Sequence, residues 1–268
     1  MPAGPPDGSA VAAAMVASTL ALAGAAERGW VRRSGSVLAM VTEIPEPTLN
    51  GVWATAGDAT AQELIAGLEA VAAEGVPHCL EVRPACAAVA AGVAEQRRLV
   101  AAPITPLMAL AGRAAALHPE ALTVRVLRPD EARVHCEVAA AAFDAPLELF
   151  MALATPRVLA LPEVRCYAGD VAGVPAVTAM TVTCGDGVGI ASVGTLPAHR
   201  GRGYASALVA RAVADGLAAG ASWAWLQSGE AALGMYERLG FEEIERWPCW
   251  VTPAGDGPEV SPPAGSRP

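Results

Sequence analysis

The residues with the clearest chemical potential lie in segment 197–214, which reads PAHRGRGYASALVARAVA. Gly201 and Gly203 alternate with Arg200 and Arg202, and an apolar run typical of a helix follows them. The start of a helix carries unpaired backbone N–H groups and the positive end of the helix dipole, so it attracts anions. Glycines let an anion approach the backbone without a Cβ in the way. The segment therefore predicts a binding site for a phosphate or pyrophosphate group.

Three kinds of nucleotide ligand could use such a site. A P-loop is excluded because its motif needs a lysine on the terminal phosphates, and all 18 basic residues of this chain are arginine. A dinucleotide site is disfavoured, since Ser206 stands where a third glycine would be and Gln227 stands where an acidic residue would bind ribose. A turn that only joins a strand to a helix leaves the combined glycines and arginines unexplained. The third candidate is coenzyme A.

Local patterns predict the elements that hold this segment. Segments 176–184 and 188–195 are β-prone runs separated by a Gly-Asp-Gly turn, which predicts an antiparallel hairpin leading into the loop. After the loop, apolar residues recur at helical spacing to about Leu217, and Gly220 ends the helix. The other elements expected in this part are a strand at 122–127, helices within 130–143 and 145–155, strands at 164–168 and 223–227, a helix at 230–239, and strands at 241–246 and 247–252.

The preceding part of the chain shows a similar order of elements. We expect an apolar helix to about residue 28, then strands at 37–41 and 51–55, a helix at 61–73, a strand at 78–82, a helix at 85–98 and a strand at 106–110. The strand–helix–strand–helix–strand order occurs in both halves, which indicates a degenerate internal duplication. The alternating pattern LTVRVL at 122–127 marks the start of the second half.

Four parts follow from these patterns. The Pro- and Gly-rich ends, 1–10 and 253–268, have little to bury and are predicted to be disordered tails. A first domain is expected at 11–118 and a second at 119–252. The uncharged run at 10–26 lacks a basic leader and is short, so we expect a buried amphipathic helix there rather than an export signal or a membrane span.

Composition excludes several classes of function. The 268 residues are 53% hydrophobic, enough for a packed core, and the net charge of −9 argues against nucleic acid as a partner because phosphate binding needs a surplus of cations. The six cysteines form no C-x-x-C pair and have no histidine at ligand spacing, so neither a zinc site nor a disulfide framework is predicted. A cytoplasmic protein that binds small molecules fits best.

At this point the sequence resembles a known family. Arg200, Gly203 and Ala205 match the R/Q-x-x-G-x-G/A pattern of the GCN5-related N-acetyltransferases, the GNAT superfamily, and MYERLGF at 235–241 looks like that family's second signature. The resemblance covers roughly 122–252 and is weak in the first half. The whole layout is similar to actinobacterial acetyltransferases in which a degenerate GNAT-like half precedes an intact one.

The resemblance implies an α+β (α/β) fold: a GNAT fold with a mixed, mostly antiparallel sheet and flanking helices, preceded by a smaller degenerate GNAT-like half. It also implies that acetyl-CoA lies between the strand ending at Thr195 and the strand 223–227. The pantetheine arm would pair with the main chain of Val193, Gly194 and Thr195, whose N–H groups would polarise the thioester. The pyrophosphate would contact the backbone of Gly201, Arg202, Gly203, Tyr204, Ala205 and Ser206, with charge added by Arg200 and Arg202. No metal is implied.

Catalysis needs a proton for the departing thiolate and a neutral amine. Tyr236 occupies the family's position for the general acid, and a phenol with a pKa of about 10 stays protonated at neutral pH. The general base is left open, because segment 188–195 has no carboxylate or histidine where many relatives have a glutamate. The candidates are Asp144, Glu148, Glu137 and Glu230, or a chain of water molecules.

Other positions carry less information. Gly229 stands where many relatives have a CoA-contacting Asn or Ser, with Ser228 one residue earlier. His199 is expected to be an ordinary loop residue. The tryptophans at 223 and 225 fall on alternating strand positions, and together with those at 247 and 250 they are expected to pack in the sheet.

The resemblance implies a cytoplasmic acyltransferase that moves an acetyl group from acetyl-CoA to a primary amine of a small molecule or amino acid by direct attack. It would work as a monomer or homodimer, with neither nucleic acid nor a membrane as partner. Two alternatives stay open: a tandem enzyme of the mycothiol-synthase type, which acetylates a cysteinyl sugar, and a CoA-binding sensor without turnover. Acceptor specificity is expected from the first helices of the second half and from its interface with the first.

Overall fold

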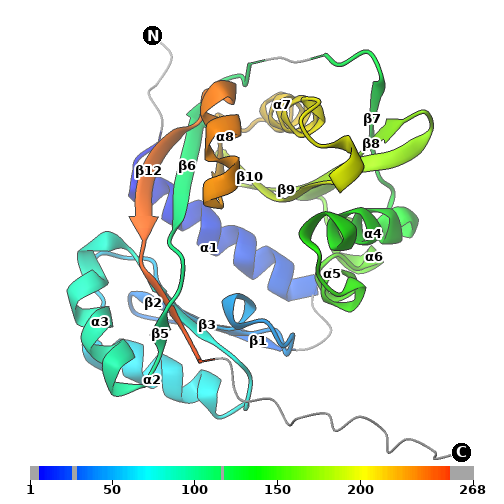
Figure 1. The fold of residues 1–268 in the computed structure, drawn as a ribbon. Helices are drawn as coiled ribbons and strands as arrows, with labels where there is room; N and C mark the ends of the chain where they lie inside the picture. Colours follow the sequence, from blue (N-terminus) through cyan, green and yellow to red (C-terminus); the bar gives the residue numbers. More distant parts are fainter. Residues whose placement is uncertain (1–5, 26–28, 116–117, 254–268) are drawn as a thin grey trace, which may run out of the picture.

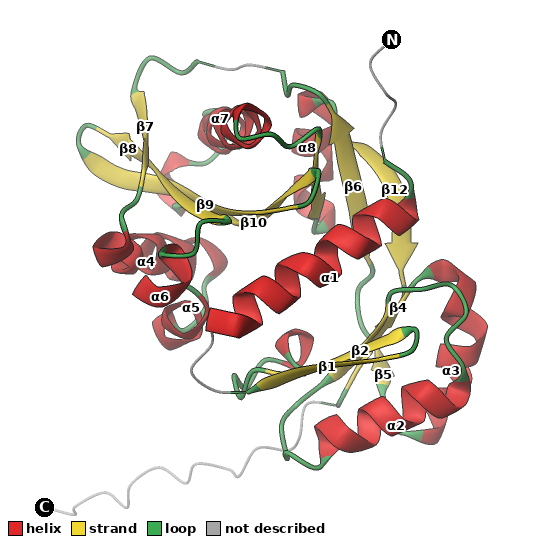
Figure 2. Cartoon of the chain, turned by 180° about the vertical axis from the view of Figure 1, so that it is seen from behind, coloured by secondary structure: helices red, strands yellow, loops and turns green. Residues whose placement is uncertain are grey.

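The computed structural model describes residues 6–25, 29–115 and 118–253. Two β-sheets lie one above the other, and the long helix α1 (Gly8–Ala25) crosses between them (Figures 1 and 2). Both sheets are mostly antiparallel, and each has helices against it. The mixed α/β fold with flanking helices that the sequence predicts is therefore confirmed.

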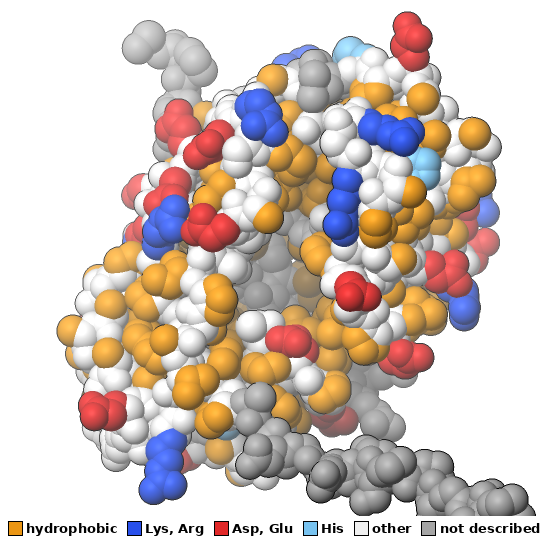
Figure 3. Space-filling view, in the orientation of Figure 1, with side chains coloured by type: hydrophobic (Ala, Val, Ile, Leu, Met, Phe, Trp, Pro, Cys, Tyr) orange, Lys and Arg blue, Asp and Glu red, His pale blue; other side chains and the backbone are white. Residues whose placement is uncertain are grey.

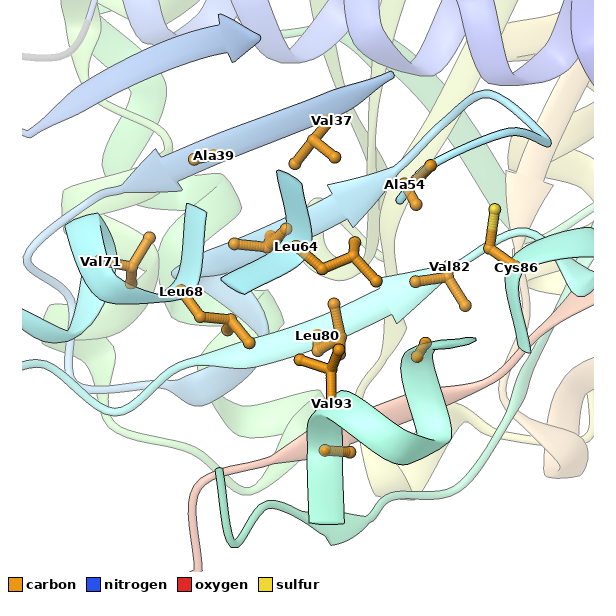
Figure 4. Close-up of a cluster of buried hydrophobic side chains, with 14 of the residues drawn as sticks. Val37, Ala39, Ala54, Leu64, Leu68, Val71, Leu80, Val82, Cys86 and Val93 are labelled. Atoms are coloured by element: carbon orange, nitrogen blue, oxygen red, sulfur yellow. The ribbon is translucent and has the colours of Figure 1, made fainter. Parts of the chain in front are cut away.

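The first sheet has the strand order β1-β2-β3-β4-β13-β5. Its strands are β1 (Trp30–Ser34), β2 (Val37–Val41), β3 (Gly51–Ala54), β4 (Cys79–Val82), β13 (Cys249–Val251) and β5 (Val100–Ala101). The neighbours β3 and β4 run parallel, and the other pairs are antiparallel. Helices α2 (Ala61–Ala72) and α3 (Ala87–Gln96) cover one face, where Leu64, Leu68 and Val93 pack on Leu80 and its neighbours (Figure 4).

The second sheet has the strand order β12-β6-β11-β10-β9-β8-β7. Its strands are β12 (Glu242–Trp247), β6 (Thr105–Ala111), β11 (Trp223–Gln227), β10 (Gly187–Thr195), β9 (Val174–Cys184), β8 (Val164–Val171) and β7 (Leu122–Val126). One face carries α7 (Tyr204–Ala218) and α8 (Leu233–Leu239); the other carries α1, α4 (Ala132–Phe143), α5 (Leu147–Leu153) and α6 (Pro156–Leu159). Here β10 and β11 are parallel neighbours, and the predicted hairpin of β9 and β10 is antiparallel.

The two halves exchange strands. β6 comes from the first half of the chain but lies in the second sheet between β11 and β12, with Trp225 opposite Ala109. β13 comes from the end of the chain but lies in the first sheet between β4 and β5, with Trp250 opposite Leu80. Each sheet thus contains one strand from the other half of the chain. A cut at the predicted boundary after residue 118 would therefore separate both sheets from one of their strands.

Some elements differ from those that the sequence predicts. Strand β1 was not expected, because its sequence WVRRS lacks an apolar alternation; it is an edge strand with exposed arginines. Strand β5 has two residues, too few for a pattern. Helix α1 begins at Gly8, inside the segment predicted to be a tail, because Asp7 Oδ1 accepts from Ala10 N at 2.8 Å. The expected continuation of this helix to residue 28, like most of the C-terminal tail, lies outside the described residues.

Helix α1 is apolar on all sides rather than amphipathic. Val11, Ala12 and Val16 pack in a cluster with side chains of both sheets, such as Trp53 and Trp225. A helix between two sheets buries more than one face, so its apolar residues do not form a single stripe. By length and mean hydropathy (1.6) α1 could also cross a membrane, a test that buried helices and signal sequences pass as well.

We predict that the two sheets unfold in one transition that depends on Trp247. This side chain is fully buried (0% exposed) in the cluster between the sheets. Replacing Trp247 by Ala should lower the free energy of unfolding by roughly 3–5 kcal/mol, since it leaves a large cavity. Denaturant unfolding followed by circular dichroism measures this change.

The control for this prediction is Trp30→Ala, on the exposed edge strand β1. It should cost roughly 1 kcal/mol, within the range of ordinary substitutions. Two separate transitions, of which Trp247→Ala shifts only one, would contradict the coupling of the sheets.

Candidate active site

Strands β10 and β11 separate soon after they meet. They pair only at Gly187–Trp223, Val188–Ala224 and Gly189–Trp225, although β10 continues to Thr195 and β11 to Gln227. The final six residues of β10 therefore have no partner strand on the β11 side. A sheet that opens in this way presents free backbone N–H and C=O groups to a ligand.

A β-bulge keeps the two strands apart. The pairing of β10 with β9 shifts register between Ala191 and Gly194, and Ser192 has a left-handed φ of 51°. Bulges bend the strand that carries them and re-aim its side chains. Ala191 is exposed although β10 lies inside the sheet, so solvent reaches the sheet at this point.

The glycine and arginine loop lies between the end of β10 and α7, as predicted. Gly201 and Gly203 have φ angles of 74° and 75°, which residues with a Cβ rarely adopt. Gly203 is the N-cap of α7 and makes no side-chain cap hydrogen bond. The first N–H groups of α7 therefore remain available to an anion.

Arg200 holds the loop in place. Its Nη2 donates to Ala142 O at 2.6 Å and its Nε donates to Thr195 O at 3.2 Å. The guanidinium thus ties the loop both to the end of α4 and to β10, a role that the sequence did not predict. Arg202 is exposed and makes no ion pair with the residues that the structure describes, so it is the arginine free to face an anion.

The other residues predicted to contact the cofactor lie along the same path. Val193 and Thr195 are half-buried, and a Cβ on Gly194 would lie 2.8 Å from Ala142 Cβ, so only glycine fits against α4. Tyr204 is 5% exposed and its ring packs with Leu208 under α7, which leaves its backbone to meet a ligand. The next two residues, Ala205 and Ser206, begin the same helix.

Tyr236 lies at the other side of the opening. It belongs to a cluster that includes Ile190 of β10 and Leu226 of β11, and its ring contacts Phe241 edge to face at 5.7 Å. Burial raises the pKa of Tyr236 to about 12. The phenol is therefore protonated at neutral pH, as the predicted acid must be.

The four carboxylates considered as bases have other surroundings. Glu137 pairs with Arg133 at 2.7 Å, and Glu230 pairs with Arg246 at 3.0 Å. Asp144 ends α4 in the left-handed conformation and, with Glu137, lines an open depression of about 570 Å³ on α4 and α5. Together with Glu148, all of these residues are exposed.

A buried carboxylate that the sequence did not single out lies near the opening. Glu81 of β4 is 9% exposed and accepts from Gln227 Nε2 at 2.7 Å and from Trp53 Nε1 at 2.9 Å. Burial raises its pKa. The sequence does show a glutamate inside the apolar segment CLEV at 79–82. Its hydrogen-bond partner Gln227, however, lies 146 residues away in the chain.

Two glycines of β10 leave no room for a side chain on the face that carries Trp223 and Trp225. A Cβ on Gly189 would lie 2.7 Å from Trp225 Cζ2, and a Cβ on Gly187 would lie 2.6 Å from Trp223 Cη2. The indole rings fill the space that a side chain would need, which agrees with their predicted role in packing. Trp225 Nε1 is buried without a hydrogen-bond partner among the described residues.

His135 is a second buried titratable group, on α4. It is 1% exposed, and its Nδ1 lies 2.7 Å from Thr178 Oγ1, which itself donates to Tyr167 O at 2.8 Å. Because the Thr178 hydroxyl donates its proton to Tyr167 O, it accepts from the ring of His135, so the ring proton is on Nδ1. Burial lowers the pKa of His135 to about 4, so the ring is neutral at pH 7.

Positions 228 and 229 are also occupied differently from many relatives. Ser228 is 2% exposed, and its Oγ donates to Gly229 O at 2.9 Å. Its hydroxyl is thus engaged with the main chain, whereas Gly229 is exposed. His199 lies near Tyr204 in the loop, with its ring 6.2 Å away.

The first half has the same parallel pair without the opening. All four residues of β3 pair with β4, from Gly51–Cys79 to Ala54–Val82. The following helix α2 is closed by its own side chains, since Thr60 Oγ1 accepts from Glu63 N and Glu63 accepts from Thr60 N. This half therefore lacks both features that could hold coenzyme A.

No set of three or more His, Cys, Asp or Glu side chains in the described residues could hold a metal ion. The six cysteines are free thiols.

Comparison with known proteins agrees with this geometry. Residues 138–241 match the sequence model of the "Acetyltransferase (GNAT) family". No curated protein matches the chain. The match covers α4 to α8 and thus includes the opening, the loop and Tyr236.

Solved structures extend the similarity over both halves. A GCN5-related N-acetyltransferase from Kribbella flavida is 22% identical, with a TM-score of 0.68 over 90% of this chain and 96% of that chain. One from Sphaerobacter thermophilus is 18% identical, with a TM-score of 0.58 over 81% and 76%. A tandem GNAT protein from the clavulanic acid biosynthesis pathway is 16% identical, with a TM-score of 0.55 over 84% and 82%. At these identities the likeness shows a shared fold, including the two-part layout.

The buried His135 should make stability depend on pH. Its pKa is 6.5 in an unfolded chain and about 4 in the fold, so the unfolded chain takes up the proton first as the pH falls. Its contribution is complete above pH 6.5 and is lost on the way down to pH 4. Between about pH 7 and pH 5, wild type should therefore lose roughly 2 kcal/mol more of its free energy of unfolding than His135→Gln does.

Denaturant unfolding at a series of pH values measures this difference. The control is His118→Gln, which replaces an exposed histidine and should follow wild type. If wild type and His135→Gln show parallel pH profiles, the imidazole is not held neutral by burial.

Proposed function

We propose that this chain, whose residues 138–241 belong to the acetyltransferase (GNAT) family, moves an acetyl group from acetyl-CoA to a primary amine. The observation that carries this proposal is the opening between β10 and β11 next to the uncapped start of α7. Together they offer a free strand edge for an amide-containing arm and backbone N–H groups for phosphates. Acetyl-CoA has both an arm and phosphates of this kind.

The free edge of β10 and the loop would each hold one part of such a ligand. The backbone of Val193, Gly194 and Thr195 would pair with the pantetheine amides, because these residues have no partner on the β11 side. The N–H groups from Gly201 to Ser206 would bind the pyrophosphate, and Arg202 would add positive charge. Arg200 would keep the loop in the shape that binding requires, through its bonds to Ala142 O and Thr195 O.

Coenzyme A supplies a thioester, whose carbonyl carbon an amine can attack. The N–H groups of β10 at the bulge would stabilise the negative charge that develops on the carbonyl oxygen. Tyr236 would give its proton to the departing sulfur, since its raised pKa keeps the phenol protonated. The free energy for this step comes from the thioester, so the chain needs only to position groups and move protons.

The acceptor is proposed to be a small amine or an amino acid that enters between the two halves. We also propose that the enzyme works in the cytoplasm as a monomer or homodimer, without nucleic acid or a membrane. The net charge of −9 supports a partner other than nucleic acid. The first half would contribute a wall of the acceptor site rather than a second active site, because its parallel strands do not separate.

Binding of the donor can be measured by calorimetry. Acetyl-CoA titrated into the protein should bind at one site per chain. Arg202→Glu should weaken the affinity about tenfold, equal to about 1.4 kcal/mol, because it places a carboxylate beside the phosphates. Arg157→Glu, on the exposed part of α6, is the matched control and should bind like wild type. Absence of any binding heat would remove the basis of the proposal.

The role of Tyr236 can be separated from binding. Tyr236→Phe should lower kcat by about 100-fold while the affinity for acetyl-CoA changes little, since only the proton donor is lost. Thiol release followed with a chromogenic disulfide measures turnover. Because the pKa of Tyr236 is about 12, wild type should show no loss of the acid form up to about pH 10. A kcat within threefold of wild type would exclude the acid role.

A further inference from the structure

Glu81 and Tyr236 lie on opposite faces of the second sheet, at the same opening. Along β11, Trp223, Trp225 and Gln227 share one face, because successive side chains of a strand alternate. Leu226 points to the other face and packs in the cluster of Tyr236. Since Gln227 donates to Glu81 Oε1 at 2.7 Å, the glutamate is on the face away from the predicted acid.

Solvent reaches this side of the opening. Gln227 and Ala191 are both exposed, although each lies on an inner strand of the sheet. Figure 3 shows the surface hollowed between the two halves, below α8 in that view. Glu81 Oε1 is bonded to the side chain of the exposed Gln227, so a molecule that binds at Gln227 needs to displace only one amide to reach the carboxylate.

The carboxylate of Glu81 has no cation beside it. Its partners are two neutral N–H groups, from Trp53 and Gln227, and no ion pair of Glu81 occurs among the described residues. Arg83, which follows the end of β4, pairs with Glu245 at 2.5 Å instead. A buried carboxylate without a counter-ion is costly, so a cationic group that reached Glu81 would be strongly stabilised there.

We propose that Glu81, supplied by the first half of the chain, binds the ammonium group of the acceptor and removes its proton, and is thus the general base that β10 lacks. This rests on the proposed acetyl transfer. Glu81 would then be a catalytic residue contributed across the interface between the halves. The acceptor class that fits is an amine protonated in solution.

Glu81 and Tyr236 together account for each proton that moves in the proposed reaction. The carboxylate of Glu81 takes one proton from the ammonium, and the neutral nitrogen forms a bond to the thioester carbon. The carbon–sulfur bond breaks, and the sulfur takes the proton of Tyr236. The nitrogen, now part of an amide, returns its extra proton to the Tyr236 oxygen, and Glu81 releases its proton to solvent. The products are an acetamide, free coenzyme A and one proton.

Other groups on this face are less suited to the task. Gly187 and Gly189 cannot carry a carboxylate under the tryptophan rings. His135 is 1% exposed, whereas Glu81 is one hydrogen bond from an exposed residue. Trp225 Nε1, which lacks a partner among the described residues, offers a donor to an oxygen atom of the same acceptor molecule.

The surroundings also suit a base that works near neutral pH. Burial raises the pKa of Glu81, which brings a carboxylate closer to the pKa values at which proton transfer is efficient. The other titratable groups nearby are the thiols of Cys79 and Cys249 and the Arg83–Glu245 pair. Burial and the contact with Cys249 raise the pKa of Cys79, so that thiol stays neutral.

The test compares Glu81→Gln with wild type in acetylation of a fixed panel: propylamine, tyramine, lysine and spermidine. Glutamine can keep both hydrogen bonds, because Gln227 can turn its amide and present its oxygen. We expect kcat/KM for the amine to fall about 100-fold or more and the acid limb of its pH profile to disappear. The affinity for acetyl-CoA, measured by calorimetry, should stay within twofold. Glu81→Asp should recover part of the rate.

The matched control is Glu74→Gln. Glu74 also accepts from a tryptophan, Trp30 Nε1 at 2.9 Å, but on the exposed side of the first half. This variant should behave like wild type, and denaturant unfolding should show all variants folded.

The outcomes separate the two proposals. If acetyl-CoA does not bind wild type, the proposed function fails. If acetyl-CoA binds and Glu81→Gln acetylates amines at the wild-type rate with the same acid limb, the role of Glu81 is overturned. It is also overturned if acetyl-CoA binds but no amine of the panel is acetylated.

Discussion

The separation of β10 from β11 after the Gly189–Trp225 pair is the constraint on which the rest of the site depends. A parallel pair that continued would consume the N–H and C=O groups of both strands and leave no edge for a ligand. The bulge at Ser192 bends β10 away and exposes Ala191 in the middle of a sheet. By our proposal, the loop after β10 then holds phosphates at one end of the opening while chemistry takes place at the other.

The exchange of β6 and β13 links the first half to the site in the second sheet. In the described residues of that half, β3 and β4 stay paired and α2 caps its own start, so the two features that form the opening in the second sheet are not repeated. The exchanged strands nevertheless place β4 against the second sheet, and Glu81 reaches Gln227 from there. By our proposal, the first half therefore supplies a wall and a base to the site of the other half.

Local sequence patterns predicted the structural features that depend on residues close together in the chain. The loop glycines, the hairpin before them and the position of Tyr236 follow from residues close in sequence, and the structure has them as expected. The strand exchange, the bond of Arg200 to Ala142 O and the pairing of Glu81 with Gln227 join distant residues, which no local pattern encodes. The absence of a glutamate from β10 was visible in the sequence, but the tryptophan rings that lie against Gly187 and Gly189 were not.

The most direct measurement is a crystal structure of the protein with acetyl-CoA. The account predicts density for the pantetheine arm between β10 and β11, paired with Val193 and Thr195. It further places the pyrophosphate on the N–H groups of Gly201 to Ser206, and the acetyl group at the bulge, on the side of the exposed Gln227. Acetyl-CoA bound elsewhere, or β10 and β11 closed along their whole length with the ligand on the surface, would contradict it.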